Sequence, residues 1–394
     1  MDDHGLSMRP PPKRTLFRAR LPAPGRGVDA TIAGFEDVRL SPEQAEDFLV
    51  ATAERLAAAR PPSAPAEFNI LAISGGAAGG AFGAGVLVGM TRAGTRPTFA
   101  IVTGVSTGAL MAPFAFLGSA WDERLTAAYT GGLAAEVLGL RRLAPAFGAG
   151  LFRPEALEQL IDPFIDEALI AAVANEHHLG RRLLITTTDL DRQRSCIWNM
   201  GAIASRRDVR AVTLFRDILV ASASLPGVFP PRRFSCEAEG VVYEEMHVDG
   251  GVAAPLFIMP EALLRWKRRG GDLQGGRIYV IVNTVLEQAP RTTATNLASI
   301  LLRSFDTMLR FSYRNALGHA ATFCAANDLP FSVATIPEDP RNGHMMSFDT
   351  DGMRRVFDSS VERAQRAGLW VTPVPDANAQ GDAPDAALNP VWLA

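Results

Sequence analysis

One serine in this sequence has surroundings that favour nucleophilic chemistry. Ser106 is the centre of Gly-Val-Ser-Thr-Gly, between Gly104 and Gly108. The apolar run before it, residues 99–103, is typical of a buried strand, and residues 109–117 are typical of a buried helix. Between a strand and a helix, this pattern holds the serine hydroxyl exposed on a sharp turn. We therefore predict that Ser106 is a nucleophile; a serine that only caps the helix stays open as the alternative.

A glycine-rich turn precedes the serine and offers backbone donors. Residues 75–80 read Gly-Gly-Ala-Ala-Gly-Gly and follow the apolar strand-like run of residues 69–74. The spacing lacks both the Gly-x-Gly-x-x-Gly of dinucleotide sites and the Gly-Lys-Ser/Thr end of phosphate loops, so we expect neither cofactor. Free N–H groups at the start of a helix suit the oxyanion of an acyl transfer. A tight turn without function is the alternative.

A serine nucleophile needs a group that accepts its proton. Residues 243–248 resemble a strand, and Asp249 follows them, at the strand end where α/β folds place their sites. An ordinary Asp-Gly turn would have the same sequence. An α/β-hydrolase arrangement would instead use a histidine after the acid, and only His319 and His344 follow Asp249. All three residues remain candidates for the base at this point.

The composition excludes several classes of protein. The chain has 394 residues, 47% hydrophobic and 21% charged, with a net charge of −3, so a sizeable core is expected and a dedicated nucleic-acid binder is not. Residues 68–121 carry only two charges, Arg92 and Arg96. This segment could be a membrane span or a buried core, and its many glycines favour the core. The three cysteines form no Cys-x-x-Cys pair, so we expect neither a disulfide framework nor a metal site.

Strand and helix signals alternate along the chain, which predicts an α/β fold with a mostly parallel sheet covered on both faces. The expected helices are residues 42–60, 82–90, 109–117, 154–174, 208–223, 260–269, 296–326 and 350–367, and the expected strands are residues 69–74, 99–103, 182–188, 241–248 and 277–282. We divide the chain into a flexible leader (1–40), an N-terminal helix (41–66), a catalytic domain (67–371) and a flexible tail (372–394). The N-terminal helix begins with a capping box, Ser41 to Gln44.

The long helix at 296–326 offers surfaces for a lipid. Leu297, Ile300, Leu301, Ser304, Phe305 and Met308 share one face of it. Arg303, Arg310 and Arg314 share another, which could meet anionic headgroups or simply lie in solvent. Phe311 and Tyr313 could line an acyl pocket or fill the core.

Taken together, the three motifs resemble the patatin-like phospholipase family, in the same order along the chain. The resemblance implies a three-layer α/β/α fold and the hydrolysis of acyl esters, typically of lipids, by Ser106 as nucleophile and Asp249 as base, without a histidine or a cofactor. It places the oxyanion hole at Gly76, Ala77 and Ala78. The remaining motif positions are Gly75, Gly79, Gly80, Gly104, Gly108, Gly250 and Gly251.

Two positions depart from the family pattern. Ala77 stands where the family commonly has a glycine, and Gly79 where it has arginine or lysine. Ala77 can still donate its N–H provided that its φ is negative, whereas the missing cation weakens the case for an anionic phospholipid.

A histidine-dependent esterase and a catalytically silent lipid-binding protein are the rival hypotheses. We expect a lipid substrate, transient contact with a membrane surface and no nucleic acid. The first residues lack a secretory signal, so a cytoplasmic location is expected.

Overall fold

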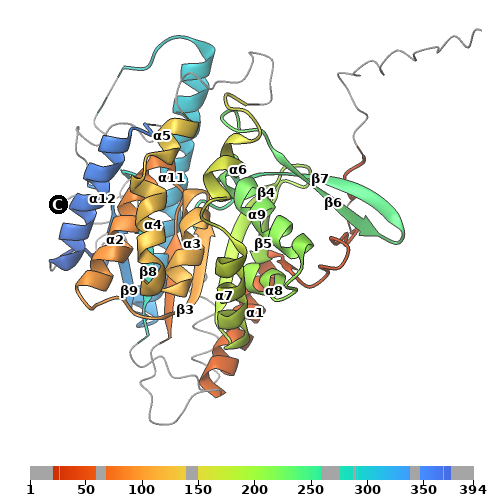
Figure 1. The fold of residues 1–394 in the computed structure, drawn as a ribbon, viewed down its shortest axis with the longest axis horizontal. Coiled ribbons are helices and arrows are strands. Elements are labelled where there is room, and N and C mark those ends of the chain that lie inside the picture. Colours follow the sequence, from red (N-terminus) through yellow and green to blue (C-terminus); the bar gives the residue numbers. More distant parts are fainter. Residues whose placement is uncertain are drawn as a thin grey trace, which may run out of the picture.

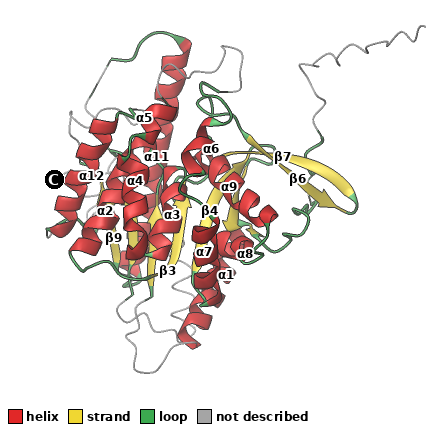
Figure 2. Cartoon of the chain, viewed as in Figure 1, coloured by secondary structure: helices red, strands yellow, loops and turns green. Residues whose placement is uncertain are grey.

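The computed structural model describes residues 21–25, 27–58, 68–138, 150–258, 276–286, 290, 292–337, 347–366 and 368–373. A twisted sheet runs through the centre of this part of the chain (Figures 1 and 2). Its strands are β1 (Arg39–Leu40), β2 (Asn69–Ile73), β3 (Phe99–Val105), β4 (Arg182–Asp189), β5 (Arg194–Asn199), β6 (Arg232–Ala238), β7 (Val241–Asp249), β8 (Ile278–Val282) and β9 (Phe331–Thr335). The order is β1-β5-β4-β3-β2-β8-β9, and β7 joins β4 to β6.

Helices cover both faces of the sheet. They are α1 (Pro42–Ala58), α2 (Gly80–Arg92), α3 (Thr107–Leu117), α4 (Asp122–Thr130), α5 (Leu133–Val137), α6 (Ala156–Ile161), α7 (Glu167–His178), α8 (Met200–Ala204), α9 (Val209–Ala223), α11 (Leu297–Ala326) and α12 (Thr350–Gln365). Alternate residues of one strand enter opposite cores: Ile73 packs with α2 and α3, whereas Ala72 packs with α11. Because a strand points successive side chains to opposite faces, both faces are buried. The predicted three-layer α/β/α fold is confirmed.

Strands β4, β3, β2, β8 and β9 are parallel to one another. Their residues are buried almost throughout, which accounts for the apolar strand sequences. The segment 68–121 forms β2, α2, β3 and α3 inside this core, so its lack of charge reflects burial. Among the described residues, no helix is both long and apolar enough to cross a bilayer.

Two expectations about helices differ from the structure or lie outside it. The single helix predicted over residues 154–174 is wrong: α6 ends at Ile161, and α7 starts after its cap Asp166, which accepts the N–H of Leu169 at 2.9 Å. Pro163 lies between the two helices, and it has no N–H to donate to the carbonyl four residues earlier, so the helix does not continue through it. The helix predicted over residues 260–269 lies outside the described residues.

Part of the predicted leader is attached to the domain. Arg39 and Leu40 pair with β5, Thr31 forms a bridge with Glu237, and Arg39 contacts the carboxylate of Glu245. The capping box at the start of α1 is present, since the Ser41 N–H donates to Gln44 Oε1 at 2.9 Å. Residues 1–20 of the leader, and residues 374–394 of the tail, lie outside the described part of the chain.

The position of β7 in the sheet brings Asp249 close to the end of β3. Strand β3 pairs with β4 up to Val105 opposite Thr186, and β7 pairs with β4 from Asp249 opposite Thr187. Because β5 occupies the other edge of β4, β3 and β7 take consecutive places along one edge. The residue after Val105 is thus brought beside Asp249, although the two are far apart in the sequence.

Candidate active site

Ser106 occupies a strained turn between β3 and α3. Its backbone has φ 58° and ψ −128°, a conformation that residues with a side chain rarely adopt. Its N–H donates to Ser222 Oγ at 3.1 Å, and the Ser222 hydroxyl donates to the carbonyl of Thr186 at 2.7 Å. Ser222 therefore ties the turn to β4. Strain that the surrounding structure maintains is common at functional residues.

The motif glycines allow this turn to pack closely against its neighbours. A Cβ on Gly104 would lie 2.6 Å from the Gly108 carbonyl oxygen, and one on Gly108 would lie 2.4 Å from that of Ile73. A Cβ on Gly75 would lie 2.9 Å from Ser106 Cβ. Similar clashes would arise at Gly79, Gly80 and Gly250, and at Gly251 a Cβ would lie 3.0 Å from Asp249 Oδ1. Any side chain at the tighter positions would push the two strand–helix turns apart.

Asp249 is fixed by its backbone at the end of β7. Its N–H donates to the Ser224 carbonyl at 3.0 Å, and its own carbonyl accepts the Thr188 hydroxyl at 2.9 Å. Its Oδ1 accepts the Gly251 N–H at 2.7 Å. Its Oδ2 is buried and has no hydrogen bond of normal geometry among the described residues. One carboxylate oxygen is thus anchored, and the other is available beside Ser106.

The surroundings of Asp249 make it a stronger base than an ordinary carboxylate. Burial raises its pKa to about 6, while the nearby Ser106 hydroxyl and the Gly251 N–H lower it in part. The Ser106 hydroxyl thus interacts with this carboxylate, although more loosely than in a full hydrogen bond. Catalytic pairs are often loose before substrate binds. The structure brings Ser106 and Asp249 together, as the resemblance implied.

The glycine-rich turn lies on the same cavity. Gly75, Gly76 and Ala77 line it, whereas Ala78 is buried and is not in its wall. Ala77 has φ +49°, so the condition attached to its N–H, a negative φ, is not met. The N–H of Ala77 lies in the plane of the peptide unit that it shares with Gly76, and a change in φ does not move it out of that plane. Ala77 can therefore still donate a hydrogen bond with a positive φ. Among the described residues, nothing accepts a hydrogen bond from the Gly76 or Ala77 N–H.

Asn283 supports this turn and was not singled out in the sequence. It directly follows β8; its side-chain amide donates to the Ser74 carbonyl at 2.9 Å, and its N–H donates to the Ser74 hydroxyl at 2.8 Å. Its Oδ1 accepts the N–H of Gly83 at 3.0 Å. Its carbonyl oxygen occupies the space where a Cβ of Gly76 or Gly79 would lie, at 1.9 and 2.1 Å. Only the fold brings Asn283 here, so no local sequence signal could have identified it.

These contacts predict opposite effects for the two changes that restore the family's usual residues. Gly79→Arg is expected to lower the free energy of unfolding by about 2 kcal/mol, because its Cβ would overlap the Asn283 carbonyl. Ala77→Gly is expected to raise it by about 0.5–1 kcal/mol, because glycine adopts a positive φ without steric cost. Urea unfolding of the two variants measures both changes. Stabilisation by Gly79→Arg would contradict the observed packing.

The cavity in front of Ser106 and Asp249 is lined mainly by apolar groups and has an open volume of about 670 Å³, including the solvent at its mouth. Its wall consists of Gly75, Gly76, Ala77, Ser106, Thr107, Leu110, Leu138, Leu157, Leu160, Ala223, Leu225, Phe229, Asp249, Gly251, Leu309, Tyr313 and Phe348. A second apolar cavity of about 610 Å³ adjoins it and shares Ala77, Thr107, Leu110, Leu160 and Phe348. Of the two aromatic residues considered on α11, Tyr313 lines the first cavity, whereas Phe311 is exposed.

Among the described residues, no histidine lines either cavity. His319 lies on the exposed side of α11, so it is not placed to serve as the base. His344 lies outside the described residues. The geometry therefore gives Asp249 as the base candidate in contact with Ser106.

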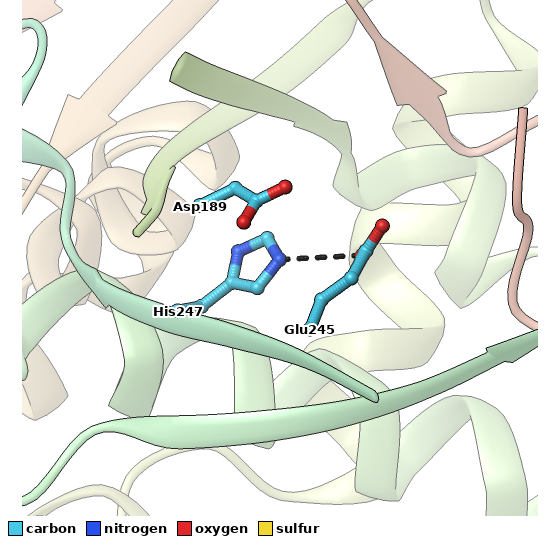
Figure 3. A group of neighbouring side chains, drawn as sticks. All are labelled: Asp189, Glu245 and His247. Atoms are coloured by element: carbon cyan, nitrogen blue, oxygen red, sulfur yellow. Dashed lines mark hydrogen bonds and ion pairs between the residues drawn. The ribbon is translucent and has the colours of Figure 1, made fainter. Parts of the chain in front are cut away.

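A buried group of three possible metal ligands lies elsewhere, between β4 and β7. Figure 3 shows Asp189, Glu245 and His247, whose ligand atoms all lie within 4.8 Å of one another. His247 Nε2 is 3.4 Å from Glu245 Oε2, and its Nδ1 is 2.8 Å from the Thr187 hydroxyl. Both ring nitrogens of His247 thus have protein partners.

Two arginines neutralise the carboxylates of this group. Arg39 contacts Glu245, and Arg192 lies 3.6 Å from Glu245 and 3.9 Å from Asp189. Burial would raise the pKa of Glu245, but the hydrogen bond with His247 and the charge of Arg39 lower it to about 2. A cation would have to displace two guanidinium groups, so this donor set fits a structural ion-pair network rather than a metal site. We assign no metal to it.

A three-layer α/β/α domain with a serine on a strained strand–helix turn beside a buried carboxylate is typical of a serine hydrolase. Residues 71–261 match the sequence model of the family described as Patatin-like phospholipase. The match covers just under half of the chain, and it supports lipid acyl hydrolase activity in general terms.

No curated protein matches the chain. Among solved structures, the chain is similar to VipD from Legionella pneumophila, with 13% sequence identity, a TM-score of 0.36, and coverage of 76% of this chain and 68% of VipD.

Proposed function

We propose that this chain hydrolyses carboxylic esters of lipids through an acyl-serine intermediate, with Ser106 as the nucleophile and Asp249 as the general base. The observation that carries the proposal is the free, buried Oδ2 of Asp249 beside the hydroxyl of Ser106 on one apolar cavity. Gly76 and Ala77, whose N–H groups have no acceptor among the described residues, line the same cavity.

The reaction proceeds in two steps, acylation of Ser106 and then hydrolysis of the acyl-serine. Ser106 Oγ attacks the ester carbonyl while its proton passes to Asp249 Oδ2, and that proton then goes to the departing alcohol. Water then gives a proton to Asp249 and attacks the acyl-serine. The proton passes from Asp249 to Ser106 Oγ as the fatty acid leaves, which restores both residues. In both steps the N–H groups of Gly76 and Ala77 stabilise the negative oxygen, and each such donor is worth about 10²–10³-fold in rate.

The character of the cavity supports an acyl substrate. Within the part of the chain that the structure describes, Asp249 is the only charged residue in the walls of the two adjoining cavities. The second cavity begins behind Thr107, next to the nucleophile, and is lined by residues such as Phe114, Leu133 and Phe164. Apolar walls with few polar groups retain an apolar chain and leave the polar groups to orient the reacting bond. A long acyl chain bound there would place its ester next to Ser106.

Covalent labelling tests the proposal on the full chain. A fluorophosphonate probe reacts with an activated serine, and peptide mass spectrometry then identifies the residue. We expect Ser106 to be labelled and the nearby buried Ser222 to remain free. With soluble nitrophenyl esters, kcat/KM is expected to rise with acyl length from two carbons upward. Absence of labelling and of esterase activity would favour the catalytically silent alternative.

The raised pKa of Asp249 predicts how the activity depends on pH. The base acts when ionised, so activity is present above its pKa of about 6 and decreases below it. Between pH 7 and pH 5, kcat/KM is expected to decrease about tenfold on a soluble ester that does not itself titrate. The melting temperature over the same range shows whether the protein stays folded. A profile that is flat from pH 5 to pH 8 would exclude Asp249 as the base.

A further inference from the structure

Tyr313 brings a hydroxyl group from α11 to the wall of the candidate active site. It lines the first cavity and is 3% exposed, and its ring belongs to the core on the α11 side of the sheet. A Cβ on Gly75 would lie 3.0 Å from the Tyr313 hydroxyl oxygen and 2.9 Å from Ser106 Cβ. Gly75, which directly precedes the two candidate oxyanion donors, is therefore enclosed between the nucleophile and Tyr313.

The Tyr313 hydroxyl also contacts the start of the glycine-rich turn. It is a hydrogen-bond partner of the Ser74 side chain and of the Gly75 backbone. The Ser74 hydroxyl in turn accepts the Asn283 N–H at 2.8 Å. The start of the turn is thus held from two elements that are distant in the sequence, by Asn283 after β8 and by Tyr313 on α11.

The turn needs such support because its backbone is unusual. Gly76 has φ 154° and Ala77 has φ 49°, conformations that residues with a side chain rarely adopt and that persist only where the surrounding structure maintains them. The N–H groups of both residues have no acceptor within the described part of the chain. Donors of this kind contribute to catalysis only when they already point to the place where charge develops. A group that fixes Gly75 therefore also fixes the donors that follow it.

Tyr313 is suited to hold the turn and not to transfer a proton. Burial, followed by the charge of Asp249, raises the pKa of its hydroxyl, so this group keeps its proton throughout the range in which Asp249 ionises. The Asp249 carboxylate has other contacts: Oδ1 accepts the Gly251 N–H, and Oδ2 has no hydrogen bond of normal geometry among the described residues. The contacts of Tyr313 thus lead to the turn and not to the base.

We propose that Tyr313 is a positioning residue for the oxyanion hole. Its hydroxyl holds Ser74 and Gly75, and the N–H groups of the next two residues are thereby kept facing the cavity. This inference rests on the proposed function, because these donors matter only if a negative oxygen forms on an acyl group bound to Ser106. Loss of the hydroxyl should therefore weaken binding of the transition state more than binding of the substrate.

Tyr313→Phe removes the hydroxyl and keeps the ring that packs in the core. On a soluble nitrophenyl ester we expect kcat to decrease about 10–100-fold with KM nearly unchanged, because a displaced donor costs less than the about 10²–10³-fold of a deleted one. Values of kcat are referred to the number of sites that a fluorophosphonate labels at completion, which corrects for misfolded protein. The control, Tyr279→Phe, is expected to match the parent, because Tyr279 packs against Phe99 and Trp370 and is not among the described residues that line either cavity.

An alkyl trifluoromethyl ketone tests the oxyanion hole itself. Ser106 Oγ adds to its carbonyl carbon, the serine proton passes to Asp249, and the carbonyl oxygen becomes the negative oxygen that the turn stabilises. In Tyr313→Phe the inhibition constant of this ketone is expected to rise by the same factor as kcat falls. The matching methyl ketone adds to a serine far less readily, and its inhibition constant is expected to stay constant. A merely structural role would weaken binding of both ketones alike.

A double-mutant cycle with Ser74→Ala shows whether Tyr313 acts through the turn. The two substitutions are expected to be non-additive in kcat, because both remove the same contact. Additive losses would give Tyr313 an action of its own on the substrate and would overturn the positioning proposal, and so would a Tyr313→Phe enzyme with the parental kcat and inhibition constants. A parent protein that neither hydrolyses esters nor binds the trifluoromethyl ketone would instead contradict the proposed function, and with it the premise of this inference.

Discussion

An Asp249→Asn variant is expected to lose about 10³–10⁴-fold in kcat/KM, because general-base catalysis contributes that much and the amide cannot accept the serine proton. Its shape is unchanged, and its side-chain oxygen can still accept the Gly251 N–H that now binds Oδ1. The Ser106 hydroxyl would be left without a base. The loss is therefore expected in kcat, with a KM close to that of the parent enzyme.

The same substitution is expected to stabilise the protein above neutral pH. The folded-state pKa of Asp249, about 6, exceeds the ordinary value of 3.8, so the folded protein binds this proton more tightly than the unfolded chain. Ionisation of Asp249 in the folded state therefore costs stability as pH rises. Removal of the charge recovers about 3 kcal/mol at pH 8 and about 1 kcal/mol at pH 4.5.

Two measurements on one protein sample check this prediction. Steady-state kinetics on a soluble ester gives the loss of activity, and urea unfolding at pH 4.5 and pH 8 gives the gain in stability. Asp217→Asn, at a partly buried acid in an ion pair with Arg232 on the surface of α9, is the control and is expected to keep full activity. An inactive variant that is also destabilised at pH 8 would indicate a structural role for Asp249 instead.

Ser106→Gly is expected to abolish hydrolysis and, at the same time, to stabilise the fold. The nucleophile is absent, so the expected loss in kcat is at least about 10⁴-fold. Glycine adopts the φ of 58° and ψ of −128° found at this turn without the strain of a side chain, which costs about 1–3 kcal/mol for other residues. The strain that holds the hydroxyl in the cavity would be relieved.

Ser106→Ala separates the two effects, because alanine removes the hydroxyl and keeps the strain. We expect both variants to be inactive and to escape fluorophosphonate labelling. Only the glycine variant should show a clear rise in melting temperature; the difference between the two variants measures the strain at the turn. Equal melting temperatures would show that the turn is not strained, and residual activity in either variant would exclude Ser106 as the nucleophile.

The local sequence predicted most of the elements around the site because their signals are short-range. The apolar runs at 69–74 and 99–103 became β2 and β3, and the glycines after them mark both turns. The capping box at Ser41 is present for the same reason. The division of the 154–174 helix at Pro163 was also readable in principle, since proline inside a helix lacks the N–H of the backbone hydrogen bond.

Other features depend on long-range contacts and were not predictable. Asn283 has no motif around it, and it supports the glycine-rich turn only because β8 runs beside β2. Ser222 supports the Ser106 turn from α9, more than a hundred residues away. The periodicity of α11 predicted an apolar face but not its surroundings, because a helical repeat has the same pattern whether it faces a core or solvent.

Local sequence patterns identified the residues that could react and the turns that hold them: a serine flanked by glycines, a glycine-rich turn with backbone donors, and an acid at a strand end. These depend on neighbours along the chain. Strands β3 and β7 follow one another along one edge of β4 only in the folded chain, and this arrangement places Asp249 at Ser106. The basicity of Asp249 also depends on the fold, because burial by distant elements raises its pKa to about 6. Desolvation depends on everything packed around a group, so it is fixed only when the chain has folded.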